Sequence, residues 1–202
     1  MAIAPHPPDD YADRLARLET MWWKRLLDVQ RPYRWYLRRL ELGFVLDVGC
    51  GVGRSLANAG GHGVGVDLSP RAVELCRLRG LEAYVPRDFL ASRHARPHLF
   101  DSLLLAHVVE HMTFSQAREL LAAYLPFVKP AGRVVLIAPQ VAGFASDATH
   151  VEYFDIPKLL RLCAAAGVPV EGHRSFPFPS AVGRIFPHNE FVVIGRAPHP
   201  SR

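Results

Sequence analysis

Short runs of apolar residues alternate with amphipathic segments along most of the chain. The runs that predict buried strands are residues 44–48, 63–66, 81–85, 102–105 and 134–138. The segments with apolar positions at helical spacing are residues 54–60, 70–79 and 115–128. This order predicts an α/β fold with a doubly wound, mostly parallel, Rossmann-like sheet and an antiparallel edge strand.

The N-terminal part precedes this alternation and has a different pattern. Residues 1–10 are rich in proline and predict a loose tail, and residues 11–30 predict an amphipathic helix. Pro32 suits the first turn of a second helix that reaches Leu40. We therefore expect residues 1–42 to form a tail and a helical lid.

The C-terminal part continues the α/β pattern. A helix is predicted between Pro157, which suits a first turn, and Gly167, which suits a C-terminal cap. Residues 191–195 predict a last strand. Together with the earlier elements, this predicts one structural domain over residues 43–202 behind the lid.

Composition is that of an ordinary globular protein, with 50% hydrophobic and 21% charged residues in a chain of 202. The three cysteines form neither a disulfide framework nor a zinc pattern, which favours a reducing compartment. The sequence has neither the pattern of a signal peptide nor an apolar run of the roughly 18 residues that a membrane span needs. We therefore expect a cytoplasmic protein.

The net charge of +5 is partly concentrated between Arg14 and Arg39, where basic and aromatic residues are interleaved. Nucleic acid or an anionic membrane surface would suit such a segment. However, the apolar residues there fall on one helical stripe and leave the arginines on the wet side. The stripe consists of Leu15, Leu18, Trp22, Leu26 and Val29. This arrangement disfavours a nucleic-acid or membrane partner.

The most informative local pattern is a strand that runs into a glycine-rich loop and then a helix, at residues 45–54. Glycine stands at positions 49, 51 and 53, where it permits unusual backbone dihedrals and close approach of a ligand. The dinucleotide fingerprint requires glycine at the sixth position from Gly49, and this chain has Arg54 there. The loop therefore predicts a nucleotide-type cofactor other than NAD.

Glycine at these positions after Leu-Asp-Val resembles the first motif of the class I S-adenosylmethionine-dependent methyltransferases. Later segments resemble further motifs of that family in the same order: an acid after the second strand, the buried strand at residues 100–112, and the Lys-Pro-Ala-Gly turn and strand at residues 129–139. The resemblance covers roughly residues 43–195. It implies S-adenosylmethionine as the cofactor and methyl transfer as the activity.

Two acidic residues follow the second and third strands. Asp67 comes twenty positions after Asp47, a spacing at which its carboxylate can accept hydrogen bonds from both ribose hydroxyls. Its alternative role is to cap the next helix, although Ser69 is already a good N-cap. The resemblance places Asp88 beside the adenine and Phe89 over it; a solvated loop aspartate is the alternative. The candidate cofactor-binding residues are Asp47, Gly49, Cys50, Gly51, Gly53, Asp67, Leu68, Asp88, Phe89 and His107.

A polar cluster follows the fourth predicted strand. His107, Glu110 and His111 would share one helical face, and His150 lies in the loop after the fifth strand. These groups are candidate ligands of a divalent metal. They resemble the Glu-x-x-Glu-His and distant His site of the ubiquinone-pathway O-methyltransferases and the small-RNA 2′-O-methyltransferases. Here His107 replaces the first glutamate, which favours manganese, iron or zinc over magnesium. Purely structural hydrogen bonds are the alternative.

The acceptor, the molecule that would receive the methyl group, is the least determined part of the predicted function. If it is a hydroxyl, it must lose a proton, and the candidate catalytic bases are His107, His111 and His150. Residues 147–154 resemble a stretch of small-molecule methyltransferases and predict a wall of the acceptor pocket. The aromatic residues considered for the pocket and its lid are Phe144, Phe154, Phe176, Phe178, Trp22, Trp23 and Trp35. We expect a small-molecule acceptor, with oxygen slightly favoured; the alternatives are methylation of RNA or protein and a non-catalytic cofactor-binding module.

Overall fold

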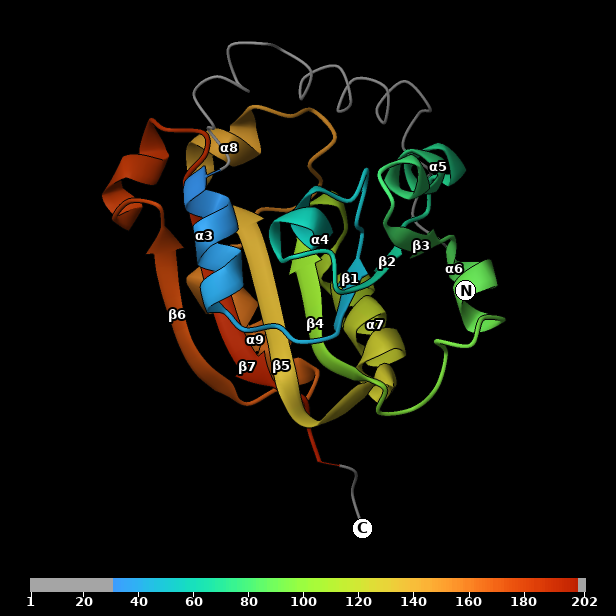
Figure 1. Ribbon diagram of the computed structural model, residues 1–202. Helices are drawn as coiled ribbons and strands as arrows, with labels where there is room; N and C mark the ends of the chain where they lie inside the picture. The colour runs from blue at the N-terminus through green and yellow to red at the C-terminus, as the bar shows by residue number, and fades with distance from the viewer. Residues whose placement is uncertain (1–30, 200–202) are drawn as a thin grey trace. The chain divides into compact units, whose positions relative to one another are not determined.

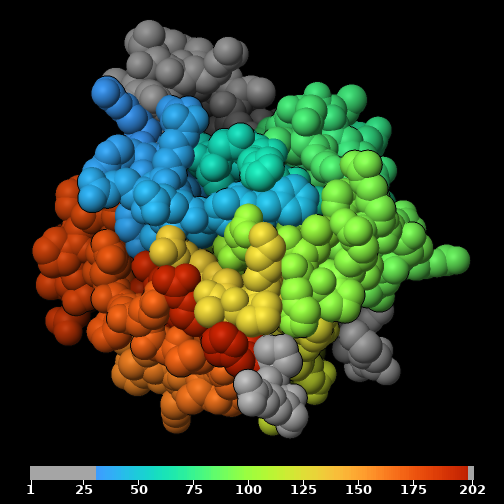
Figure 2. Space-filling model, turned by 60° about the horizontal axis from the view of Figure 1, so that its bottom comes forward, coloured from blue at the N-terminus to red at the C-terminus, as the bar shows by residue number. Residues whose placement is uncertain are grey.

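The computed structural model describes residues 31–199, in two compact units that meet in the chain between Ala95 and Arg96. The helix predicted over residues 11–30 lies outside the described residues, whereas the second predicted helix is present as α3 (Arg31–Arg39). The segment that contains α3 lies at the molecular surface (Figure 2).

Unit 1 contains three parallel strands in the order β3-β2-β1 (Figure 1). Every residue of β1 and β2 is buried, which explains why both strands are apolar apart from Asp47. The β2 glycines are required by close packing, since a Cβ on Gly63 would lie 2.2 Å from the carbonyl oxygen of Val45. The strands are β1 (Val45–Val48), β2 (Gly63–Val66) and β3 (Glu82–Tyr84).

The helices of unit 1 follow the strands in turn. The predicted N-cap is confirmed at α5, where the Ser69 hydroxyl accepts a hydrogen bond from Ala72 N at 3.2 Å and Pro70 occupies the first turn. α5 contacts both β2 and β3. The helices that follow strands are α4 (Arg54–Asn58), α5 (Pro70–Leu78) and α6 (Pro86–Leu90).

Unit 2 contains four strands in the order β4-β5-β7-β6. β4 and β5 are parallel, and β7 runs antiparallel to both β5 and β6, so the edge strand β6 is joined by antiparallel pairing. The strands are β4 (Phe100–Ala106), β5 (Val128–Pro139), β6 (Val170–Phe176) and β7 (Glu190–Arg196). The predicted α/β class with mostly parallel strands and an antiparallel edge is confirmed.

Short helical segments connect these strands. α7 and α9 contact each other, and α9 contacts β6 and β7. The segments are η1 (Val109–His111), α7 (Phe114–Tyr124), η2 (Leu125–Phe127), α8 (Val141–Ala145), α9 (Ile156–Ala165) and η3 (Ser180–Arg184). Within residues 31–199, each helix is too short or too polar to cross a membrane.

Four elements differ from the sequence predictions. The helix predicted over residues 115–128 was too long: α7 ends at Tyr124, a 3-10 turn containing Pro126 follows, and Val128 already belongs to β5. β6 was not predicted because its residues are mostly exposed and polar, as suits an edge strand. α6 and α8 are five residues long and fall below what periodicity can detect.

Candidate functional site

The glycine-rich loop of unit 1 turns directly over the end of β2. Gly49 N and Cys50 N both donate to the carbonyl oxygen of Val66, at 2.7 and 3.1 Å. Gly49, Gly51 and Gly53 all have positive φ, at 75°, 52° and 82°. Side chains rarely adopt this left-handed conformation, which explains why the loop has glycine at each of these positions.

Asp67, immediately after β2, ties this loop to the next helix. Its Oδ2 accepts from Gly51 N at 2.7 Å, and its Oδ1 accepts from Ser69 N at 2.9 Å. A carboxylate can accept about four hydrogen bonds. The structure therefore gives Asp67 a loop-holding role that is compatible with the predicted ribose contact.

The loop glycines differ in what lies beside them. A Cβ on Gly51 would meet open space, with no atom within 4 Å. A Cβ on Gly53 would lie 2.6 Å from both the Cys76 sulfur and a Leu81 methyl carbon. Gly53 is therefore required by packing, whereas Gly51 keeps a space beside the loop clear. That open space fits a ligand such as the predicted cofactor.

Asp47 lies in β1 beneath the loop and is only 1% exposed. Burial, followed by the nearby Asp67 carboxylate, raises the pKa of Asp47 to about 7, although a hydrogen bond from the backbone of Leu56 opposes this. Its Oδ2 has no hydrogen-bond partner among the described residues. Burial of the Asp47 carboxyl beside the glycine-rich loop therefore costs folding free energy.

The other predicted cofactor residues of unit 1 lie in different surroundings. Cys50 is buried in an apolar cluster with Cys76, whose thiol together with burial raises the Cys50 pKa well above its usual value. Leu68 is 37% exposed and Asp88 is exposed on α6, so both are accessible. Phe89 is fully buried, which leaves no surface of its ring to cover an adenine.

In unit 2, the polar residues after β4 do not form the predicted helical face. His107 has a positive φ of 60°, and its backbone N–H donates to the Ile137 carbonyl oxygen at 2.9 Å. His107 therefore lies outside the short helix η1. Its Nε2 lies 2.8 Å from Glu190 Oε1, and its Nδ1 lies 3.4 Å from Glu110 Oε1. His107 thus joins two glutamates, one of which comes from β7.

These carboxylates determine the charge of His107. Burial favours the neutral imidazole, but the charges and hydrogen bonds of Glu190 and Glu110 outweigh it and raise the His107 pKa to about 10. The side chain remains 43% exposed, so water screens part of this effect. Because carboxylate oxygens only accept hydrogen bonds, contacts at both ring nitrogens favour the doubly protonated form.

The structure brings three of the four predicted metal ligands together. Glu110, His111 and His150 each offer an atom within 4.8 Å of the others. The Glu110 side chain is 1% exposed; its Oε1 lies 3.4 Å from His107 Nδ1, and its Oε2 has no hydrogen-bond partner among the described residues. His150 Nδ1 lies 2.7 Å from the carbonyl oxygen of Phe144, which leaves Nε2 for a ligand. A buried carboxylate beside two such imidazoles fits a divalent cation.

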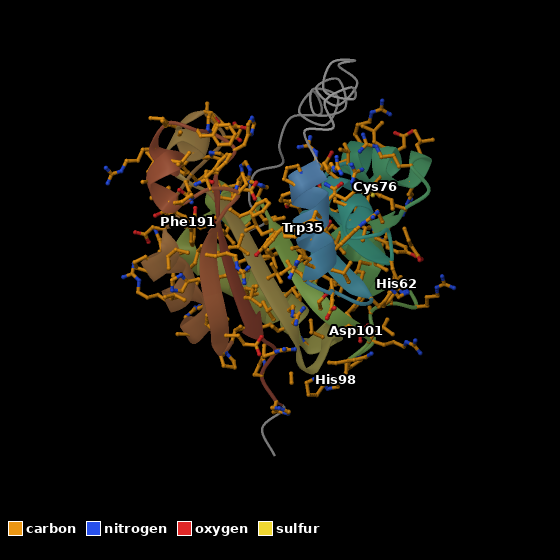
Figure 3. All side chains as sticks on the ribbon, turned by 60° about the vertical axis from the view of Figure 1, so that its left-hand side comes forward. Trp35, His62, Cys76, His98, Asp101 and Phe191 are labelled. Atoms are coloured by element: carbon orange, nitrogen blue, oxygen red, sulfur yellow. The ribbon has the colours of Figure 1, made fainter. Side chains whose placement is uncertain are left out.

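Glu190 is the residue of this cluster that sequence reasoning did not identify. It begins β7 beside the fully buried Asn189, and its carbonyl accepts from the buried Gln140 side chain at 3.0 Å. In Figure 3, the labelled Phe191 lies at one end of the sheet of unit 2, and Asp101 near the start of β4 lies toward the other. Because β7 runs antiparallel to β5, its first residues reach the end at which β4 finishes. Two consecutive polar residues at the start of a buried strand were the available signal.

The aromatic residues considered for the acceptor pocket divide into two groups. Phe144 stacks on His150, with ring centroids 5.2 Å apart, and Phe178 is 47% exposed. Phe154, in contrast, is a core residue. Trp35 in unit 1 is 56% exposed beneath the Arg39 guanidinium, and Trp22 and Trp23 lie outside the described residues.

Comparison with known sequences identifies the relatives of the chain. A family model described as a methyltransferase domain matches residues 45–132. A ubiquinone biosynthesis O-methyltransferase of Xanthomonas euvesicatoria pv. vesicatoria is 32% identical over 162 residues, which cover 70% of this chain and 66% of the relative. A protein of the same name from Xylella fastidiosa is 29% identical over 160 residues, covering 70% of this chain and 64% of its own. The chain thus spans slightly less than two thirds of these relatives.

Solved structures have the same fold. A chain from a Haloferax volcanii complex between a methyltransferase and its activator has a TM-score of 0.70 at 18% identity, covering 96% of this chain and 97% of its own. A S-adenosylmethionine-dependent methyltransferase of Archaeoglobus fulgidus has a TM-score of 0.64 at 18% identity, covering 85% and 99%. At these identities the likeness concerns the fold alone.

Proposed function

Because the chain belongs to the class I S-adenosylmethionine-dependent methyltransferases, we propose that it methylates a hydroxyl oxygen of a small-molecule acceptor. The observation that carries the choice of oxygen is the Glu110, His111 and His150 cluster, in which proton-accepting groups converge. The name of the Xanthomonas relative, an O-methyltransferase, supports the same choice.

We assign cofactor binding to unit 1. The open space beside Gly51 accommodates the cofactor, and the Asp67 carboxylate accepts hydrogen bonds from its ribose. Leu68 and Asp88 are accessible and remain candidates beside the adenine. S-adenosylmethionine would supply, when bound, a methyl group whose carbon a nucleophilic oxygen can attack while its bond to the positively charged sulfur breaks.

We assign proton removal to His111 or His150 rather than to His107. A general base must offer a lone pair to the hydroxyl proton of the acceptor. His107 has a carboxylate oxygen at each ring nitrogen, so it holds protons at both. His111 and His150 each direct Nδ1 at backbone oxygens and retain Nε2. Besides a base, methyl transfer requires that the protein hold the acceptor oxygen in line with the methyl group and exclude water.

We further propose that Glu110, His111 and His150 can hold a divalent cation, in which case the Nε2 lone pairs of both histidines would bind the metal and neither histidine would act as the base. Two imidazoles and one carboxylate suit manganese, iron or zinc better than magnesium, which prefers oxygen ligands. Such an ion would lower the pKa of a bound hydroxyl and so ease its deprotonation. Unlike the sequence-based ligand set, this set omits His107, because its nitrogens already contact Glu190 and Glu110.

The first experiment tests methyl transfer and its acceptor. Protein is incubated with methyl-labelled S-adenosylmethionine and with separated small-molecule, RNA and protein fractions of cell extract. We expect label in the small-molecule fraction, in a product that contains a methyl ether. Label only in RNA or protein would contradict the small-molecule assignment, and no transfer to any fraction would contradict the proposed activity.

The cofactor assignment is tested by calorimetry with Asp67→Ala. Loss of a charge-assisted hydrogen bond is worth about 1.5–3 kcal/mol, so S-adenosylmethionine affinity should fall about 10-fold or more. Glu74→Ala, at an exposed position of α5, is a control for charge removal outside the candidate cofactor residues. Unchanged affinity in the Asp67 variant would remove that residue from the cofactor site.

The cation assignment is tested by metal removal. Purified protein is analysed for stoichiometric divalent ions, and methyl transfer is then measured after treatment with a chelator and after manganese is restored. We expect activity to fall on chelation and to return with the ion. Absence of a stoichiometric ion, with activity indifferent to the chelator, would exclude the cation while leaving methyl transfer intact.

A further inference from the structure

We propose that Asp147 and Thr149 are positioning residues that hold the proton of His111 on Nδ1 and so keep the Nε2 lone pair available to a ligand. The inference rests on the proposed function, which gives His111 a ligand to bind. It assigns a role to two surface residues that lie outside the candidate ligand set.

The direction of the hydrogen bonds follows from Asp147. Its Oδ1 lies 2.7 Å from the Thr149 hydroxyl oxygen and accepts a second bond from Thr149 N at 2.9 Å. A carboxylate has no proton to give, so the Thr149 hydroxyl must donate to Asp147. The oxygen of that hydroxyl then has only lone pairs to offer in any other direction.

His111 lies in one of those directions. Its Nδ1 is 3.2 Å from the Thr149 hydroxyl oxygen and 3.3 Å from the Thr149 carbonyl oxygen. Both partners act as acceptors, so Nδ1 must carry the proton that satisfies them. In a neutral imidazole with a protonated Nδ1, the lone pair is on Nε2.

His150 has the same tautomer because of a different contact. Its Nδ1 donates to the Phe144 carbonyl at 2.7 Å, which also leaves the lone pair on Nε2. The ring centroids of His111 and His150 lie 4.8 Å apart, and the buried carboxylate of Glu110 lies in the same cluster. Three lone-pair donors thus converge, which favours a cation or a hydroxyl donor.

The contribution of Thr149 differs from that of a simple packing contact. Metal-binding histidines usually donate their second N–H to a carboxylate or carbonyl, and removal of such a partner costs about 10- to 100-fold in metal affinity. Thr149→Val removes the hydroxyl while keeping the shape of the side chain. Because the Thr149 carbonyl remains, we expect the lower end of that range. Thr149→Ser keeps the hydroxyl and is the matched rescue variant.

The first measurement reads the tautomer directly in metal-free protein. Long-range proton–nitrogen NMR of the imidazoles distinguishes protonated from unprotonated ring nitrogens. In the neutral form of wild-type and Thr149→Ser protein, His111 should be protonated on Nδ1, whereas Thr149→Val should show a mixture of both tautomers. A wild-type His111 protonated on Nε2, or an unchanged tautomer in Thr149→Val, would overturn the inference.

The second measurement is calorimetric titration with manganese. Affinity should fall about 10-fold in Thr149→Val and stay close to wild type in Thr149→Ser. Equal affinity in all three proteins would contradict the positioning role. Asp147→Asn replaces Thr149→Val if that variant does not fold, and it should also weaken manganese binding.

The two readouts separate this inference from the proposed function. If wild-type protein binds no manganese but the tautomer depends on Thr149, the cation assignment fails and the positioning role stands. If manganese binds but neither the His111 tautomer nor the manganese affinity changes in the Thr149 variants, the positioning role fails and the cation assignment stands.

Discussion

At the residue scale, the three histidines around β4 and β5 differ in the partners of their ring nitrogens. His107 faces a carboxylate oxygen at each nitrogen, which favours a fixed cation. His111 faces the hydroxyl and carbonyl oxygens of Thr149 at Nδ1, and His150 faces the Phe144 carbonyl at Nδ1, which leaves Nε2 of each ring for a ligand. Three residues of one type therefore lie in two kinds of hydrogen-bonding surroundings. Residue identity alone does not distinguish them.

The glycine loop allows a prediction at the same scale. Gly51→Ala places a Cβ in the open space beside the loop and adds about 1–2 kcal/mol of left-handed strain. Gly53→Ala adds similar strain and also drives its Cβ against the Cys76 sulfur. We expect Gly51→Ala mainly to weaken S-adenosylmethionine binding, and Gly53→Ala mainly to lower the melting temperature.

Calorimetry and thermal unfolding of both variants check this distinction. Gly80→Ala is a suitable control, because Gly80 also has positive φ and open space around it but lies outside the loop. It should lower stability by the strain alone and leave cofactor affinity unchanged. Wild-type affinity in Gly51→Ala would show that the space beside Gly51 is not the cofactor site.

At the scale of elements, turns and caps decide where each element ends. Pro126 and the 3-10 turn η2 stop α7 before β5 begins, although the apolar pattern continues through this region. At its other end, α7 begins with a capping box: Thr113 accepts from Gln116 N, and the Gln116 side chain accepts from Thr113 N at 2.9 Å. The cap fixes α7 two residues after His111, next to the polar cluster.

Removal of this cap should destabilise unit 2. Thr113→Ala leaves backbone N–H groups of the first turn unsatisfied and should cost about 1 kcal/mol. In a chain of this size, that corresponds to a loss of about 2–4 °C in melting temperature. Ser115→Ala, at an exposed position of the same turn, is the matched control. A melting temperature equal to that of the control would exclude a stabilising cap.

At the scale of the whole molecule, the buried Asp47 links stability to pH. Its pKa is raised in the folded state to about 7, so the folded chain binds more protons than the unfolded chain between the ordinary value and about 7. The unfolding free energy contributed by this group is therefore highest at acidic pH, falls as pH rises through that window and is constant above it.

Asp47→Asn should remove this dependence. The variant should gain stability over the wild type as pH rises from about 4 to about 7, with little difference at the acidic end. Urea unfolding of cofactor-free protein at several pH values measures the difference. Asp88→Asn removes an exposed carboxylate as a control, and a pH dependence no larger than that of the control would contradict the buried-acid interpretation.

The local sequence was sufficient to predict a turn, cap or strand wherever the residues that determine it are neighbours in the chain. The turn at Gly49, Gly51 and Gly53, the cap at Ser69 and most strands follow from glycine dihedrals, side-chain caps and apolar runs, which act within a few residues. The exposed edge strand β6 lacks such a signal, because its side chains do not face a core. It is defined by pairing with β7 instead.

The pairing of His107 with Glu190 was decided by tertiary structure alone. The two residues are 83 positions apart and meet because β7 runs antiparallel beside β5, which brings its first residue to the end where β4 finishes. Strand register sets that contact, and a local pattern does not contain it. The chain's own pattern of residues thus specified the glycine-rich loop and the kinds of side chain near it, whereas long-range pairing determined which partners the ring nitrogens of His107 contact.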